Sequence, residues 1–146
     1  MRFLRLLALS WLSIFAVFSG VSAQVSDSVQ PDERAAVRSV IEGQLSAFAA
    51  DDADRAFSFA SQNIQEMFIT ARNFMDMVRI AYPVVYRPAG VSFQVPVKRG
   101  DDVWQAVQMR DAHGIDWVAI YNLQRHGNGA WKINGCVLKK DTDRPA

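Results

Sequence analysis

Apolar residues recur at helical spacing in the first half of the chain beyond residue 30. Proline suits the first position of a helix, and the acidic pair Asp32 and Glu33 favours its positive end. One face of the segment that starts at Pro31 carries Val37, Val40, Ile41, Gln44, Leu45 and Phe48. This pattern predicts an amphipathic helix that packs against another part of the fold.

Three shorter helical segments follow, and each begins after a residue that can cap it. "ADDADRAFSFAS" restarts a helix behind Asp52, "SQNIQEMF" adds a turn or two from Ser61, and "ARNFMDMVRIAY" follows Thr70. Proline disfavours helical backbone in the residue before it, so Pro83 is predicted to end the last helix.

After Pro83 the pattern changes to β-branched and aromatic residues with alternation. "VVYRPAGVSFQVPVKRG", "DVWQAVQMRD", "IDWVAIYNLQR" and "AWKINGCVLKK" read as strands, and "AHG" and "HGNG" read as turns between them. Gly135 is expected to permit a bulge before Cys136. Helices first and sheet second predict an α+β fold, with helices on one face of a curved, mainly antiparallel sheet of four or more strands.

The N-terminus has the features of an export signal. Arg2 and Arg5 precede an almost wholly apolar run from Leu6 to Phe18, and small residues end at Ala23. The run is shorter than the roughly 20 residues that span a bilayer. We therefore expect a cleaved signal peptide at residues 1–23, a flexible segment at 24–30, one cone-like domain at 31–140 and a flexible tail at 141–146, in a periplasmic or secreted protein.

Charge and cysteine usage narrow the function classes. Removing Arg2 and Arg5 changes the formal charge from +1 to −1, which leaves no basic field for nucleic acid or anionic lipid. We expect no nucleic-acid partner and no membrane association after cleavage. Cys136 is the only cysteine, so no internal disulfide can form.

Histidine and cysteine are the first candidates for chemistry at individual residues. His113 and His126 lie in turns at opposite ends of one strand, roughly 30 Å apart by strand rise, so they cannot share a metal ion. Cys136 has no thiolate-stabilising partner in its strand and is interpreted as a buried filler, with redox chemistry as the alternative. We expect no metal and no cofactor.

Carboxylates and aromatics offer further candidates. Asp51, Asp52 and Asp54 are better explained as a helix cap and solvated neighbours than as a catalytic base. Aromatic residues in the sheet or at its entry could line an open mouth of the fold or pack in the core. Arg87 could meet a ligand carboxylate or close a structural ion pair. The candidate ligand-binding residues are therefore Tyr82, Tyr86, Arg87, Trp104, Trp117 and Tyr121.

The motifs "VIEGQLSAFAADDADRAFSFAS", "AYPVVYRP" and "WKINGCVL" resemble an exported bacterial family, domain of unknown function 4864, and the nuclear transport factor 2-like, or cystatin-like, cone fold. That resemblance implies the fold, whereas cone-fold relatives include enzymes, ligand binders and dimerisation domains. The leading hypothesis is a non-catalytic domain that binds a small apolar or aromatic ligand or another protein, with a homodimer through the sheet as one form. The alternatives are an isomerase or lyase that uses a buried Asp and Tyr, and a thiol redox protein.

Overall fold

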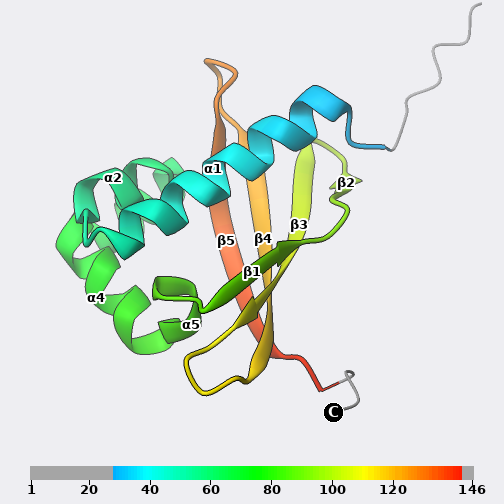
Figure 1. Cartoon of the computed structure of the whole chain (residues 1–146). Coiled ribbons are helices and arrows are strands. Elements are labelled where there is room, and N and C mark those ends of the chain that lie inside the picture. Colours follow the sequence, from blue (N-terminus) through cyan, green and yellow to red (C-terminus); the bar gives the residue numbers. More distant parts are fainter. Residues whose placement is uncertain (1–27, 143–146) are drawn as a thin grey trace, which may run out of the picture.

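Residues 28–142 of the chain are described by a computed structural model. Five helices come first and pack on one side of a five-stranded antiparallel sheet (Figure 1). The predicted α+β, cone-like fold is confirmed. The predicted signal peptide lies outside the described residues, as do residues 24–27 and 143–146. Within residues 28–142, no helix has both the length and the apolar character needed to cross a membrane.

The helical layer follows the predicted caps. Asp52, Ser61 and Thr70 each accept a hydrogen bond from the backbone N–H three residues on, at 3.0, 3.4 and 3.2 Å. These bonds satisfy backbone donors that the first helical turn leaves free. The helices are α1 (Pro31–Ala49), α2 (Ala53–Ser58), α3 (Gln62–Phe68), α4 (Ala71–Ala81) and α5 (Pro83–Tyr86).

The segment after Pro83 differs from the extended conformation that its β-branched residues predict. Pro83 ends α4 but also begins α5, a single helical turn, because proline is well suited to the first helical position. Val84 and Val85 are adjacent and both buried. A strand would turn one of the two valines away from the core, whereas a helical turn lets both pack inward.

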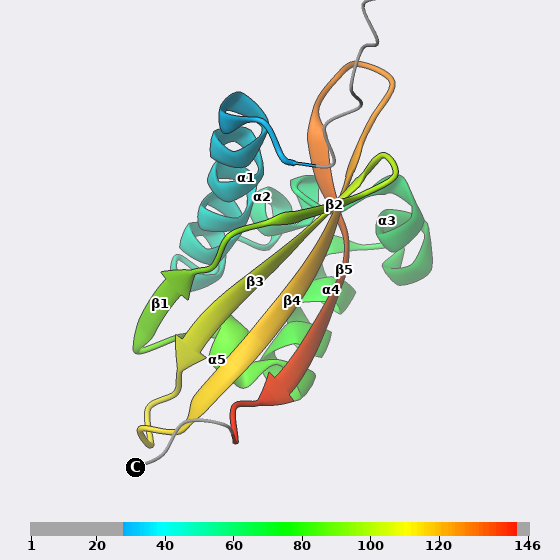
Figure 2. The same ribbon diagram turned by 90° about the vertical axis from the view of Figure 1, so that its right-hand side faces the viewer.

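The sheet runs in the order β1, β3, β4, β5, and β2 also pairs with β3. Figure 2 looks at the sheet from the side away from the helices. Along β3 and β4 the face toward the helices is formed by cross-strand pairs such as Val107 with Ala119 and Gln105 with Tyr121. The strands are β1 (Gly90–Phe93), β2 (Val97–Arg99), β3 (Asp102–Arg110), β4 (Asp116–Arg125) and β5 (Trp131–Lys140).

Strand β5 carries the predicted bulge. Its pairing with β4 shifts between Asn122, opposite Gly135, and Leu123, opposite Ile133, so Asn134 is the extra residue. In a regular strand Ile133 and Cys136, which are three residues apart, would point to opposite faces, because side chains alternate along a strand. The bulge turns both toward the helices.

The free edge of β5 is largely covered by the chain itself. Ile133 bonds through its N–H to the Phe59 carbonyl at 2.9 Å and through its carbonyl to the Ser61 N–H at 2.7 Å. Farther along, the Tyr82 hydroxyl donates to the Cys136 carbonyl at 3.1 Å. Beyond Cys136 the edge ends in Lys139 and Lys140, and charged residues at an edge oppose strand addition.

Candidate functional site

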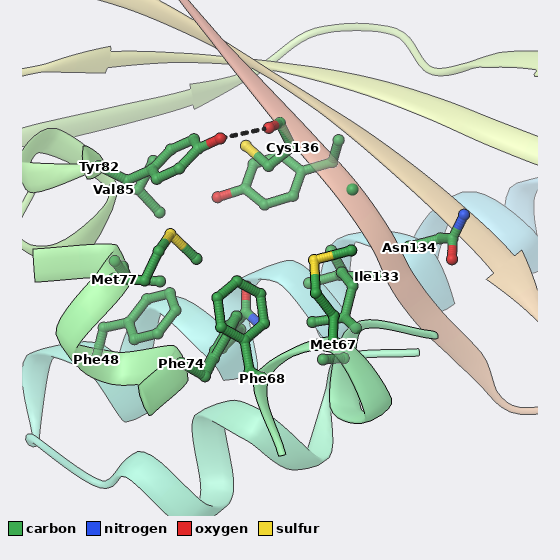
Figure 3. A pocket seen from close by; sticks show the side chains of 16 residues that line it. Phe48, Met67, Phe68, Phe74, Met77, Tyr82, Val85, Ile133, Asn134 and Cys136 are labelled. Atoms are coloured by element: carbon green, nitrogen blue, oxygen red, sulfur yellow. Dashed lines mark hydrogen bonds between the residues drawn. The ribbon is translucent and has the colours of Figure 1, made fainter. Parts of the chain in front are cut away.

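An apolar cavity lies between the helical layer and the bulged part of β5. Its volume is about 280 Å³. Met67, Phe68 and Met77 face Ile133 and Cys136 across it (Figure 3). The lining residues are Gln44, Phe48, Ala60, Ile64, Met67, Phe68, Phe74, Met77, Val78, Tyr82, Val85, Tyr121, Ile133, Asn134, Gly135 and Cys136, none of them charged.

The helical wall of the cavity is built around Phe74. Its ring lies 5.3 to 6.0 Å from the rings of Phe48, Phe57 and Phe68, within the range of favourable aromatic contacts. Helix α3 completes this wall although none of its residues is fully buried. Met67, at the cavity, keeps 72% of its surface exposed, so the cavity opens to solvent beside α3.

The opposite end of the cavity is closed by a hydrogen-bonded pair. Tyr82 donates its hydroxyl to the Cys136 carbonyl at 3.1 Å (Figure 3). Both residues also line a second, wider groove of about 840 Å³ that includes Arg87, His113 and Trp117. Tyr82 and Cys136 therefore form the wall shared by the apolar cavity and this groove.

Tyr121 and Cys136 face each other across β4 and β5 at the sheet side of the cavity. Burial raises the pKa of Tyr121 well above its usual value, and the neighbouring thiol raises it further. Burial likewise raises the pKa of Cys136 to about 12, against a smaller opposing effect of Tyr121. Both groups are therefore protonated and neutral at physiological pH.

Comparison with known proteins decides the family. The model of the family described as "Domain of unknown function (DUF4864)" matches residues 30–146. The chain belongs to the DUF4864 family. No curated protein matches the sequence.

A solved structure gives the fold of this DUF4864 chain independently. An NTF-2-like protein of unknown function from Silicibacter pomeroyi DSS-3 is similar with a TM-score of 0.52 and 15% sequence identity. The similarity covers 75% of this chain and 96% of that one. The predicted resemblance to the family and to the nuclear transport factor 2-like cone fold is confirmed. That fold is compatible with ligand binding and specifies no ligand.

The six candidate residues of the DUF4864 chain do not share one cavity. Tyr82 and Tyr121 line the apolar cavity, while Arg87 and Trp117 line the groove with Tyr82. Trp104 pairs with Asn122, next to the pair formed by Gln105 and Tyr121. Because neighbouring pairs alternate between faces, Trp104 lies on the outer face of the sheet, away from both. Arg99 stacks over its ring at 5.6 Å.

Tyr86 and Arg87 belong instead to a charged cluster around Asp51. Asp51 accepts hydrogen bonds from Tyr86, from Arg79 at 3.0 Å and from Arg87 at 2.9 Å. The Tyr86 hydroxyl and the two guanidinium groups hold the pKa of Asp51 below its usual value. Asp51 is therefore exposed but not merely solvated, and Arg87 forms the structural ion pair that was one of its two predicted roles.

The catalytic alternatives find little support in this site. No carboxylate lines the apolar cavity, so the buried Asp that the isomerase or lyase alternative uses as its base does not lie there. Asp111 lines the groove but accepts hydrogen bonds from Trp117 and from the backbone of His113 and Ile115, each at 2.9 Å. Within residues 28–142, no three His, Cys, Asp or Glu side chains cluster closely enough to hold a metal ion.

Proposed function

We propose that this DUF4864 protein is a non-catalytic domain that binds a small, uncharged, apolar molecule in the cavity between α3, α4 and β5. The observation that carries the proposal is the cavity lining, in which no side chain is charged and most are aliphatic or aromatic. Such a surface, open to solvent at Met67, is typical of small-molecule sites.

Cavity size sets the scale of the molecule. A cavity of about 150 Å³ lined by apolar side chains is enough to take benzene. The cavity here, at about 280 Å³, is nearly twice that volume. It is therefore suited to a molecule of two or three aromatic rings or to an acyl chain of similar volume.

Binding can be tested with a neutral fluorescent probe, N-phenyl-1-naphthylamine, which brightens in apolar surroundings. Ile64 lines the cavity and is half-buried, so Ile64→Trp should fill it and weaken probe binding at least tenfold. Ile80 is 84% exposed and lies outside this cavity. Ile80→Trp is therefore the matched control and should leave affinity within about twofold.

The result that would overturn the proposal is equal probe binding by the two folded tryptophan variants, or no saturable binding by the unsubstituted protein. Native mass spectrometry of protein isolated from its own host adds a second measurement. A retained small molecule that is present in Ile80→Trp and lost in Ile64→Trp is the expected outcome.

The site of action that we propose is outside the cytoplasm. The proposal depends on the basic, apolar and small-residue order of the N-terminus that ends at Ala23. Intact mass measurement of the full chain expressed in a bacterium should give a periplasmic species that begins at Gln24. A cytoplasmic protein that retains Met1 would contradict export.

A further inference from the structure

The Tyr121 hydroxyl is a buried polar group at the cavity that lacks a hydrogen-bond partner among the protein groups of residues 28–142. The residue is only 1% exposed. Within the described part of the chain, the Cys136 thiol is the one side chain that interacts with the hydroxyl, and this interaction raises the pKa of Tyr121 and opposes the rise in the pKa of Cys136. It does not have the geometry of a hydrogen bond, and sulfur is a weak acceptor that does not replace an oxygen or nitrogen partner. A buried hydroxyl without a partner is costly and uncommon in folded proteins.

The other polar groups at the cavity are already engaged. Tyr82 donates to the Cys136 carbonyl at 3.1 Å, and Gln44 donates its amide to the Ala56 carbonyl at 3.2 Å. Asn134 accepts a hydrogen bond from the Ser61 hydroxyl at 2.9 Å. Among the described residues, the Tyr121 hydroxyl is the one buried side-chain nitrogen or oxygen atom that makes no hydrogen bond.

The charge of the cavity limits what can accept that hydrogen bond. None of the lining side chains is charged, so a buried carboxylate or ammonium group of a ligand would lack a counter-ion. An uncharged acceptor pays a much smaller desolvation cost and can still take a hydrogen bond from a neutral phenol.

We infer that the ligand carries an uncharged carbonyl-type acceptor, as in a ketone, aldehyde, ester or amide, and that it binds with this oxygen on the Tyr121 hydroxyl. This inference rests on the proposed function and deepens it. The apolar remainder of the ligand lies against Phe74, Met77 and Ile133. Tyr121 acts as a positioning and specificity residue, with no covalent or proton-transfer step.

Three molecules of one size separate the contributions. 2-Acetylnaphthalene has the carbonyl, 2-ethylnaphthalene replaces it with a methylene group, and 2-naphthoate replaces it with an anion. Affinities for the unsubstituted protein, Tyr121→Phe and Tyr82→Phe are measured by displacement of N-phenyl-1-naphthylamine. Tyr82→Phe is the matched control because it removes a phenol that lines the same cavity but is already hydrogen-bonded.

The expected result is selective. Tyr121→Phe should weaken binding of 2-acetylnaphthalene about five- to tenfold, the usual range for one neutral hydrogen bond, and leave 2-ethylnaphthalene within about twofold. Tyr82→Phe should change the affinities of these two molecules by the same factor. 2-Naphthoate should bind the unsubstituted protein at least tenfold more weakly than the ketone.

Failure of the inference can be told from failure of the proposed function. If Tyr121→Phe changes the ketone and the hydrocarbon equally, or if 2-naphthoate binds most tightly, the carbonyl acceptor is excluded while the apolar binding site stands. If none of the three molecules displaces the probe and the probe itself does not bind, the proposed function fails and the inference fails with it.

Discussion

Tyr121 is buried on the inner face of β4, and no oxygen or nitrogen atom within residues 28–142 accepts a hydrogen bond from it, which leaves the Cys136 thiol as a weak partner. Removing a buried hydroxyl that lacks a partner relieves a desolvation cost. We therefore expect Tyr121→Phe to raise the free energy of unfolding by roughly 1 kcal/mol in the absence of ligand. Urea denaturation monitored by circular dichroism measures this change.

Tyr82 provides the comparison for that measurement. Tyr82→Phe removes a hydrogen bond that covers the edge of β5 and should lower the free energy of unfolding by roughly 1 kcal/mol. A Tyr121→Phe variant that is destabilised as much as Tyr82→Phe would show that the Tyr121 hydroxyl is already satisfied in the unliganded protein. If Tyr121 serves ligand binding, Tyr121→Phe should be more stable than the unsubstituted protein and should distinguish the ketone from the hydrocarbon less well.

The raised pKa of Cys136, which lines the same cavity as Tyr121, can be tested through the reactivity of its thiol. Its pKa is raised by burial from 9.0 to about 12, so its thiolate fraction at pH 8 is on the order of 1000-fold lower than that of an ordinary thiol. Cys136 is half-buried at the cavity wall, so native protein should react with iodoacetamide more slowly than urea-unfolded protein by up to that factor, as followed by intact mass. Comparable rates in the two states would contradict burial and would favour thiol chemistry.

The same shift has a consequence at alkaline pH. A thiol with a higher pKa in the folded state stabilises the fold fully below about pH 9, and this contribution is lost as pH rises toward 12. Cys136→Ala should therefore show a smaller decrease in melting temperature between pH 8 and pH 10 than the unsubstituted protein. If the melting temperature of Cys136→Ala decreases as much as that of the unsubstituted protein, groups other than Cys136 cause the loss of stability at alkaline pH.

Among the elements, the connection from α3 to α4 is strained. Ile69 has φ 66° and ψ −45°, and the Thr70 N–H bonds to the Phe68 carbonyl at 2.7 Å, which together form a γ-turn. Positive φ is unfavourable for a β-branched residue, and Ile69 is 79% exposed, so packing does not compensate. The turn leads directly out of Phe68, which lines the cavity.

Glycine at this position should relieve the strain. Ile69→Gly is expected to raise the free energy of unfolding by roughly 1 kcal/mol, after allowance for the greater flexibility of glycine in the unfolded chain. Ile69→Ala keeps the unfavourable φ and should gain less. Thermal unfolding measures the stability of the two variants. If Ile69→Gly is less stable than Ile69→Ala, the γ-turn at this position is contradicted.

In helix α1, close packing against Phe59 explains the glycine at position 43. A methyl group at Gly43 would lie 2.6 Å from Cζ of Phe59, closer than packed carbons allow. Alanine normally stabilises a helix interior by up to about 1 kcal/mol over glycine, but overpacking costs about 1 to 3 kcal/mol. We expect Gly43→Ala to lower the free energy of unfolding by roughly 1 kcal/mol, measured in urea, and exposed Ser39→Ala on the same helix to be neutral or slightly stabilising.

The sequence predicts the helices and strands better than it predicts the residues that line the cavity. Caps at Asp52, Ser61 and Thr70 act within three residues, so local pattern is enough to find them. Tyr82 and Tyr121 stand out as aromatics and do reach the cavity. Met67 and Phe68 do not stand out, because apolar residues at helical spacing look the same whether they fill a core or line a pocket.

The remaining errors come from tertiary context. Val84 and Val85 favour a strand by composition, yet burial of both requires the helical turn of α5. Aromatic character alone places Tyr86 and Trp104 in one group with Tyr121. Which face each one occupies depends on strand register and on where Asp51 lies, and neither can be obtained from spacing along one sequence.

For the molecule as a whole, the two ends of α1 are attached to the rest of the fold by carboxylates. Glu33, with its side chain 17% exposed, pairs with Lys98 of β2 at 3.5 Å and with Arg125 of β4 at 3.1 Å. Asp51, just beyond the other end, pairs with Arg79 and Arg87. The helix that covers the sheet is thus joined to both layers by four ion pairs.

The sheet's outer face is the surface on which the predicted homodimer would form. It carries Trp104 and Ile120 beside polar residues such as Asn122 and Gln124, and in Figure 2 no helix lies over it. A homodimer through this face stays a prediction, which sedimentation velocity across a range of concentrations can test.

Acid pH should weaken the attachment of α1 at both ends. Burial would raise the pKa of Glu33, but the Gln30 N–H, Lys98 and Arg125 outweigh it and hold the pKa below 4.5. Tyr86 and Arg79 do the same for Asp51, whose usual value is 3.8. A carboxylate with a lowered folded-state pKa stabilises the protein above its unfolded-state value, and this contribution is lost as pH falls through the folded-state value.

The expected result is a decrease in melting temperature that begins as pH falls below about 4.5. In the double variant Glu33→Gln and Asp51→Asn this decrease should be smaller, while at pH 7 the variant should be less stable than the unsubstituted protein. Asp54→Asn is the control, because Asp54 is exposed and lies in α2 outside these ion pairs. Equal acid sensitivity of the double variant and the unsubstituted protein would mean that other carboxylates control acid unfolding.

The ion pairs at the two ends of α1 should also differ in their response to salt. Because the Asp51 side chain is more exposed than that of Glu33, added salt should reduce the contribution of Asp51 to stability more than that of Glu33.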